Sequence, residues 1–253
     1  MVFKRLFGRT QHETPRAWHI PAGQRVYAVG DIHGRRDLLD QLLGQIDADD
    51  ASRGPADTTL IFLGDLADRG PDSRGVIERL MQLQAASPNV VCIAGNHEEL
   101  LIKGWECERA IGPVFNRAGG RATLMSYGVT AEQYDDWSLA EMVEQIGHVV
   151  PEDHITFLRS FSDFHRVGDY LFVHAGLRPG IPAEDQDTED LRWIRREFTD
   201  SPVDHGCMVI HGHTITDDVD IWPNRIGIDT GAFASDKLTA IGLEGTERWF
   251  LQT

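Results

Sequence analysis

Cysteine is scarce in this chain, with only three in 253 residues, at Cys92, Cys107 and Cys207. The number is odd and no two of them form a CxxC pair, which speaks against a disulfide framework. We therefore expect free thiols in a reducing, cytoplasmic environment. Long apolar runs are also missing, because no stretch approaches the about 20 residues that a membrane-spanning helix needs.

Basic residues are outnumbered, with 24 Lys and Arg against 40 Asp and Glu, so that the formal net charge is −16. Phosphate backbones are bound by clustered Lys and Arg, and this balance therefore disfavours a nucleic-acid partner. The excess of acidic residues otherwise serves solubility.

Residues 1–23 form an expected N-terminal tail. They begin with basic residues but contain neither a long apolar stretch nor a small-residue cleavage site, so no secretory signal is predicted. A weak amphipathic anchor through Phe3, Leu6 and Phe7 is the alternative to a frayed tail, which is the preferred interpretation. We expect no membrane partner.

The apolar pattern of the remaining chain predicts an α/β fold. Strand-like runs at 25–29, 58–63 and 89–94 alternate with helical patterns that begin near Arg36, Ser73 and His97. This alternation predicts a parallel layer with right-handed crossovers. From residue 161 the pattern turns to strands, interrupted by one predicted helix over 188–198. We expect one domain, 24–253, with two β-layers, helices outside them and a helical cap inserted at about 105–160.

Polar side chains follow five of the predicted strands, each beside a glycine. They are Asp31 and His33 in GDIHG, Asp65 and Asp68 in GDLADRG, Asn96 and His97 in GNHE, His174 in HAG, and His211 and His213 in HGHT. In open α/β sheets, sites assemble at the carboxyl ends of strands. Such groups at the ends of core strands are costly unless they are paired or bound to metal.

The types of these residues indicate the metal chemistry. Asp, His and Asn without cysteine suit Mn, Fe, Zn or Mg rather than a structural zinc module. Two or more carboxylates with three or more imidazoles exceed what one ion needs. One carboxylate that bridges two ions is the economical arrangement.

The five motifs, in this order, resemble the metallophosphoesterase superfamily, and more narrowly its bacterial PPP-type serine/threonine phosphatases. The resemblance runs from about Val26 to Leu243 and includes GGRATLMSYG, LRWIRREF and RIGIDTGA. It implies a four-layer αββα sandwich with a small helical cap and a hydrolase that uses two divalent ions, with Mn²⁺ expected first and Fe, Zn or Mg as alternatives.

The resemblance also implies a role for each matching residue. Asp65 bridges the two ions, and a hydroxide between them is the nucleophile. His97 donates a proton to the leaving oxygen, and Asp68 orients its ring. The remaining assigned residues are the ligands Asp31 and His33 for the first ion, the ligands Asn96, His174 and His213 for the second, and Arg69 and Arg195 as a clamp on the phosphoryl oxygens.

The chain departs from the family pattern at two places. Ala94 stands where many PPP phosphatases have an arginine before GNHE, which predicts a weaker phosphate grip or a wider pocket. Ile215 stands where the wider superfamily often has a further histidine ligand, and this matches the PPP branch. We expect Glu98, Asp229 and His211 to support the site without ligating a metal.

Three functions are open at this point. The first is hydrolysis of phosphoserine and phosphothreonine in proteins, with small phosphate esters accepted in vitro. The alternative is a symmetrical dinucleoside tetraphosphate hydrolase that uses the same site. A metal-binding module without turnover is disfavoured, because it has no need of His97, Asp68 and Arg69. The sequence does not set the oligomeric state.

Overall fold

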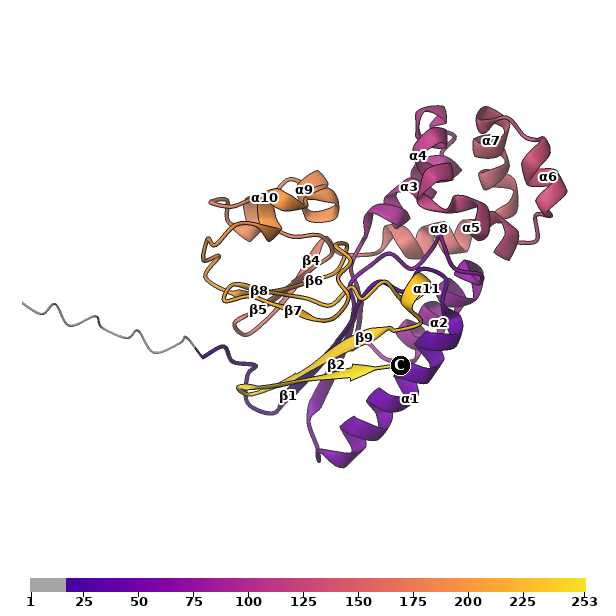
Figure 1. Cartoon of the computed structure of the whole chain (residues 1–253). Helices are drawn as coiled ribbons and strands as arrows, with labels where there is room; N and C mark the ends of the chain where they lie inside the picture. Colours follow the sequence, from indigo (N-terminus) through magenta and orange to yellow (C-terminus); the bar gives the residue numbers. More distant parts are fainter. Residues whose placement is uncertain (1–16) are drawn as a thin grey trace, which may run out of the picture.

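The computed structural model describes residues 17–253 and consists of two five-stranded sheets with helices on their outer faces (Figure 1). The expected anchor at Phe3, Leu6 and Phe7 lies outside the described residues. Among the helices of residues 17–253, none has the length and apolar character needed to cross a bilayer.

The first sheet contains the three parallel strands that the sequence predicts. β1 pairs in parallel with β2, and β2 with β3, while β9 and β10 add an antiparallel edge. In spatial order the strands are β10 (Glu247–Gln252), β9 (Thr239–Glu244), β1 (Gln24–Val29), β2 (Asp57–Phe62) and β3 (Val90–Cys92), and the crossover helices are α1 (Arg36–Ser52) and α2 (Ser73–Ala86).

The second sheet is built from the C-terminal half of the chain. Its strands β5, β6 and β8 run parallel, and the two edge strands pair antiparallel with their neighbours. The spatial order is β4 (Phe164–Val167), β5 (Tyr170–Val173), β6 (Met208–His211), β8 (Arg225–Gly227) and β7 (Asp220–Ile221). The predicted hairpin of β4 and β5 is confirmed.

Side-chain alternation along the strands explains the layers. Val26 and Ala28 of β1 belong to a core between the sheets that also contains Phe172 of β5, whereas Tyr27 and Val29 face the opposite way and pack with the helices. Successive residues of a strand point to opposite faces, so each strand that is apolar on both faces joins two cores. The predicted αββα sandwich is confirmed.

The outer face of the second sheet is covered by α9 (Thr188–Trp193) and α10 (Arg196–Thr199). The prediction of one continuous helix over 188–198 is wrong, because the backbone breaks at Arg195, with φ −130° and ψ −106°. Ile194 and Phe198 on either side are both buried against the sheet. The break thereby allows the guanidinium of Arg195 to reach the carbonyl of His213.

The segment between β3 and β4 is helical, and several of its helices stand away from the strands (Figure 1). Its buried side chains, such as Phe115, Leu124 and Ile146, join the same core as the outer face of the first sheet. The helices are α3 (Asn96–Trp105), η1 (Arg109–Ile111), α4 (Gly112–Ala118), α5 (Gly120–Ser126), α6 (Ala131–Asp136), α7 (Leu139–Val149) and α8 (Glu152–Arg159), and the two short helices of the later chain are η2 (Ala183–Asp185) and α11 (Ala232–Ser235).

Candidate active site

The loops that follow β1, β2, β3, β5 and β6 meet at one edge of the sandwich, and the structure brings the predicted metal ligands together there. All of them are buried, and none is more than 5% exposed. They are Asp31, His33, Asp65, Asn96, His174 and His213.

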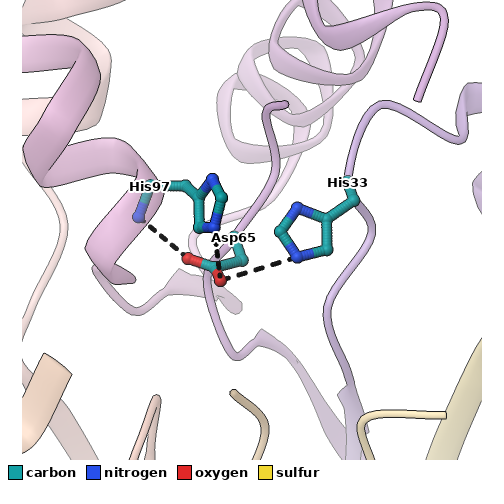
Figure 2. A group of neighbouring side chains, drawn as sticks. All are labelled: His33, Asp65 and His97. Carbon is teal, nitrogen blue, oxygen red and sulfur yellow. Dashed lines mark hydrogen bonds and ion pairs between the residues drawn. The ribbon is translucent and has the colours of Figure 1, made fainter. Parts of the chain in front are cut away.

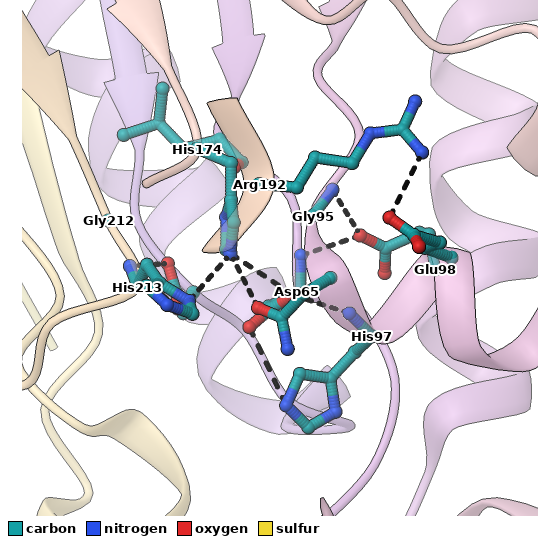
Figure 3. Close-up of polar contacts among 12 residues, drawn as sticks. Asp65, Gly95, His97, Glu98, His174, Arg192, Gly212 and His213 are labelled. Atoms are coloured by element: carbon teal, nitrogen blue, oxygen red, sulfur yellow. Dashed lines mark hydrogen bonds and ion pairs between the residues drawn. The ribbon is translucent and has the colours of Figure 1, made fainter. Parts of the chain in front are cut away.

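Asp65 lies at the centre of the cluster. Its Oδ2 is 3.6 Å from Nε2 of His33 and 3.7 Å from Nε2 of His97 (Figure 2). Its Oδ1 is 3.4 Å from Nε2 of His174, which in turn lies close to His213 (Figure 3). The two oxygens of one carboxylate therefore face two separate groups of imidazoles, which is the arrangement that a bridging ligand requires.

Around His174, nitrogen and oxygen atoms converge. Burial favours the neutral form of this ring, but the carboxylate of Asp65 outweighs burial and raises its pKa. Nδ1 of His174 donates to the carbonyl of Leu63 at 2.8 Å, so the lone pair of the neutral ring is at Nε2. This Nε2 is 3.0 Å from Oδ1 of Asn96 and 3.2 Å from Nδ1 of His213. Oxygen and imidazole nitrogen atoms turned toward one point form a suitable donor set for a divalent cation.

His33 and His213 each have a buried ring nitrogen without a hydrogen-bond partner. In His33, Nδ1 donates to the carbonyl of Ala67 at 2.8 Å, which leaves Nε2 unpaired. Burial lowers the pKa of His33 to about 3, and burial together with His174 lowers that of His213 to about 2. Both rings are thus neutral near pH 7, which is the state that binds metal.

The acidic members of the cluster also require positive charge. Asp31 accepts the backbone N–H of His213 at 3.1 Å, and burial together with the carboxylates of Asp229 and Asp65 raises its pKa well above its usual range. In Asp229, Oδ1 accepts the N–H of Gly231, while Oδ2 is buried without a partner. Buried carboxylates in one pocket are costly unless cations compensate them. The residues therefore fit divalent metal ions.

The backbone of the site loops is strained. Among the described residues, seven non-glycine positions have positive φ, and five of these belong to the site: His33, Asp65, Asp68, Arg69 and His213, with φ from 46° to 71°. Non-glycine residues rarely adopt this conformation, and each such position costs about 1–3 kcal/mol. Strain of this kind is held in place by the surrounding structure.

Two glycines of the motifs are required by close approach. A Cβ at Gly95 would lie 2.2 Å from Oδ1 of Asp65, and one at Gly212 would lie 2.0 Å from Oδ1 of Asp31. Any side chain at either position would displace a carboxylate of the cluster.

Glu98 organises the loops without facing the metal cluster. Its buried carboxylate accepts the backbone N–H groups of Asp65, Leu66 and Gly95, at 2.8 to 2.9 Å (Figure 3). These bonds join the end of β2 to the start of α3. This position agrees with the expectation that Glu98 supports the site.

His97 has the surroundings of a proton donor. Its Nδ1 is 2.6 Å from Oδ2 of Asp68, and its Nε2 is 3.2 Å from Nη2 of Arg69. Burial favours the neutral ring, but the Asp65 and Asp68 carboxylates outweigh it and raise the pKa of His97 to about 9. These two carboxylates thus favour the protonated form of the imidazole.

The two arginines border different grooves beside the cluster. The guanidinium of Arg69 lies 4.8 Å from the ring centre of Phe233 and lines a groove of about 610 Å³ with Arg35 and Arg36. Nη1 of Arg195 donates to the carbonyl of His213 at 3.3 Å, and Arg195 lines a second groove of about 390 Å³. Both guanidiniums thus lie next to residues of the cluster.

The structure also places four positions around the cluster that are not among the predicted ligands. Ala94, which stands where many PPP phosphatases have an arginine, is buried and only 4% exposed. His211 is bonded to the carbonyl of Gly212 and to Arg225, and it does not join the metal cluster. Sequence reasoning assigned no role to Phe233, whose ring also contacts that of His33, or to Thr123. Thr123 lies in the GGRATLMSYG segment, whose resemblance to the family could have pointed to it.

The chain has two sheets with outer helices, and buried imidazoles and carboxylates gather at the carboxyl ends of its strands, an arrangement suited to metal-dependent hydrolysis. The chain belongs to the calcineurin-like phosphoesterase family, whose model matches residues 24–234. The resemblance found in the motifs is therefore confirmed, and the family together with the two groups that share Asp65 indicates a site for two metal ions.

Relatives of two activities are similar to the chain. Serine/threonine-protein phosphatase 2 of Escherichia coli is 25% identical over 238 residues, 91% of this chain and 96% of that protein. The symmetrical bis(5'-nucleosyl)-tetraphosphatase of Methylococcus capsulatus is 28% identical over 159 residues, but the match spans 63% of this chain and less than half, 45%, of that protein.

Solved structures share the fold. A crystal structure whose proposed activity is that of a diadenosine tetraphosphatase aligns with a TM-score of 0.62 and 23% identity, over 91% of this chain and 94% of that one. The cold-active protein-tyrosine phosphatase of a Shewanella species aligns with a TM-score of 0.55 and 17% identity, over 92% and 83% of the two chains.

Removing divalent metal is expected to destabilise the protein, because the buried carboxylates then lack compensating charge. At a free Mn²⁺ concentration a hundred times its Kd, binding to the folded state adds about 2.7 kcal/mol. For a domain of this size that raises Tm by about 5–10 °C. Thermal unfolding of chelator-treated protein, with and without Mn²⁺ and at matched ionic strength, measures the shift. A Tm that is independent of metal contradicts the assignment.

Proposed function

We propose that this chain is a metal-dependent phosphomonoesterase that hydrolyses phosphoserine and phosphothreonine in proteins. The observation that carries this proposal is the similarity to a serine/threonine-protein phosphatase over nearly the full length of both chains. A phosphorylated protein or peptide in the cytoplasm is the proposed substrate, and Mn²⁺ is the proposed metal.

The proposed ligand sets follow from the cluster around Asp65. Asp31 and His33 would hold one ion and Asn96, His174 and His213 the other, with one oxygen of Asp65 turned toward each group. When bound, two such ions neutralise phosphoryl charge and lower the pKa of coordinated water toward neutrality. The carbonyls of Leu63 and Ala67 accept hydrogen bonds from Nδ1 of His174 and His33, which fixes the orientation of these two rings.

In the proposed mechanism, His97 gives the proton at Nε2 to the leaving oxygen. Its pKa of about 9 keeps that proton in place at neutral pH, and the bond from Nδ1 to Asp68 fixes the ring. The alkoxide of serine or threonine is a poor leaving group, so protonation as the ester bond breaks is worth about 10²–10⁴ in rate. Asp68 also stabilises the imidazolium in the resting state.

The guanidiniums of Arg69 and Arg195 would bind the non-bridging oxygens of the phosphoryl group. Guanidinium groups make paired hydrogen bonds to phosphate, and in a buried site they stabilise its developing charge. A terminal phosphoryl group offers three such oxygens, whereas a diester has one fewer and a further substituent. The arrangement therefore favours monoesters.

A symmetrical dinucleoside tetraphosphatase is the second candidate. The groove next to Arg69 favours it, because its walls include Arg35, Arg36 and the ring of Phe233, and its volume of about 610 Å³ leaves room for a longer polyphosphate. The arginines of this groove are partly neutralised, since Arg35 pairs with Asp37 and Asp236. This neutralisation weakens the attraction for a highly charged chain.

Comparison of two substrates tests the assignment. We expect kcat/KM at saturating Mn²⁺ to be higher for a phosphothreonine peptide than for diadenosine tetraphosphate, and activity on p-nitrophenyl phosphate to be readily measured. If the dinucleotide is preferred by more than about tenfold, or about 1.4 kcal/mol of transition-state free energy, the second candidate replaces the first.

The acidic surface predicts a second preference, among phosphopeptides that differ in sequence. With a net charge of −16, the protein is expected to prefer phosphopeptides without acidic neighbours of the phosphorylated residue. Peptides that differ only in these neighbours should show a preference that shrinks as salt is added, because salt screens charges on the surface.

A further inference from the structure

The helical segment 105–160, which the sequence predicts as a cap and which we call the cap, contacts the proton-donor side of the site through its GGRAT residues, 119–123. The carbonyl of Gly119 accepts the backbone N–H of Arg69 at 3.3 Å, and a Cβ at Gly119 would lie 2.7 Å from that nitrogen. Four residues further along, Thr123 of α5 is fully buried and donates a hydrogen bond to the carboxylate of Asp68. The cap is therefore packed directly against Asp68 and Arg69, whose side chains contact the ring of His97.

The hydroxyl of Thr123 makes two bonds to the same aspartate. Oγ1 donates to Oδ1 of Asp68 at 2.5 Å and accepts the backbone N–H of Asp68 at 2.9 Å. Oγ of Ser73 lies 3.0 Å from the same N–H and 3.0 Å from Oγ1 of Thr123. Asp68 thus has its main chain and its side chain held by two neighbouring hydroxyls.

This bonding fixes which oxygen of Asp68 faces His97. Oδ1 is engaged by Thr123, and Oδ2 is the oxygen 2.6 Å from Nδ1 of His97. Asp68 is fully buried, and its φ of 71° is a strained conformation that the surrounding bonds have to maintain. Without the hydroxyl of Thr123, Oδ1 would lose a hydrogen bond in a site closed to water, and the carboxylate could rotate away from the imidazole.

We propose that Thr123 is a positioning residue for proton donation: it holds Asp68, which in turn orients His97. This inference rests on the proposed role of His97 as the acid, and it assigns a function to a residue of the cap. The cap then contributes to proton donation by His97 through the hydroxyl of Thr123. Ser73 of α2 also supports Asp68, to a lesser degree.

The test replaces the hydroxyl of Thr123 by a methyl group and keeps the shape of the side chain. Thr123→Val is expected to lower kcat about tenfold for a phosphothreonine peptide, whose leaving group needs a proton, and less than twofold for p-nitrophenyl phosphate, whose leaving group does not. Thr123→Ser retains the hydroxyl and should restore most of the rate. Equal losses of kcat on both substrates, or no loss on either, overturn the proposal.

A matched control separates this effect from the loss of any threonine hydroxyl. Thr58 of β2 is half-buried, and its Oγ1 likewise donates to an aspartate, Oδ1 of Asp50 at 2.7 Å, but it lies at the start of the strand, away from the site. Thr58→Val should leave both rates within twofold of the unaltered enzyme. If it reproduces the selective loss seen with Thr123→Val, the proposal is wrong.

A spectroscopic measurement makes the test independent of activity. A proton shared between Nδ1 of His97 and a carboxylate gives a low-field imidazole resonance in the proton NMR spectrum, which His97→Ala identifies by its loss. We expect this resonance to disappear or shift in Thr123→Val and to persist in Thr123→Ser. An unchanged resonance in Thr123→Val overturns the proposal even if the substrate assignment fails.

Should Thr123→Val not fold, Ser73→Ala serves as the second variant, since Ser73 bonds both Thr123 and the backbone of Asp68. We expect it to give a smaller loss, about threefold in kcat, with the same preference for the peptide substrate. Thermal unfolding of both variants confirms which of them retain the native fold. Equal losses on the two substrates would again contradict the proposal.

Discussion

Asp65→Asn is expected to abolish turnover and binding of the metal pair together. Among residues 17–253, the carboxylate of Asp65 is the only group whose two oxygens face both sets of imidazoles, at 3.6 Å from His33 and 3.4 Å from His174. An amide presents one oxygen and one N–H₂ group, so one of the two sets would lose its shared ligand. Even though Asp65 is buried, the neighbouring His174 and His97 hold its pKa well below the usual range, so the native residue is a carboxylate.

Metal content and activity measured on the same samples check this prediction. We expect kcat to fall below detection and the metal content, by elemental analysis after dialysis, to fall from two ions per chain to one or none. Asp47→Asn, which changes an exposed aspartate of α1, is the control and should retain both properties. A variant of Asp65 that keeps two tightly bound ions would show that this residue does not bridge them.

His97→Ala is expected to lower kcat by about 10²–10⁴ for a phosphothreonine peptide while leaving the metal content nearly unchanged. Nδ1 of the ring is bonded to Asp68, and Nε2 is next to the guanidinium of Arg69. A positive neighbour suits a position from which a proton is donated and disfavours one that binds a cation.

Leaving-group dependence distinguishes the role of this histidine. The loss should shrink for p-nitrophenyl phosphate, because nitrophenolate leaves without protonation. His148→Ala, at an exposed position on α7, is the control and should retain full activity. Equal losses for alkyl and aryl esters would exclude a proton donor, and loss of one ion per chain would make His97 a ligand, as its distance of 3.7 Å to Asp65 allows.

Residues that follow directly from a strand were the most predictable part of the site. A buried strand shows in the sequence as an apolar run, and the carboxyl ends of neighbouring strands meet at one edge. Asp65 and His174 could therefore be placed near each other although 109 residues separate them in the numbering. The two-layer architecture was predictable for the same reason, since apolar runs on both faces of a strand require covering layers.

Contacts that depend on how separate elements pack were not predictable. The break at Arg195 follows from burial of Ile194 and Phe198 on the same sheet, which a helical sequence pattern does not reveal. Thr123 meets Asp68 across 55 residues because α5 packs onto the loop that follows β2. The contact of Phe233 with His33 likewise arises only when α11 closes over the loop after β1.

The left-handed backbone at Asp68 and Arg69 limits how this enzyme can be improved. Glycine adopts such φ values without a steric penalty, so substitution by glycine would relieve strain there while removing a side chain that we propose to act in catalysis. A search for greater thermal stability alone would therefore also sample residues with proposed roles in catalysis. Engineering for stability should hold these loops constant and draw its substitutions from the outer helices, where activity and stability are not opposed.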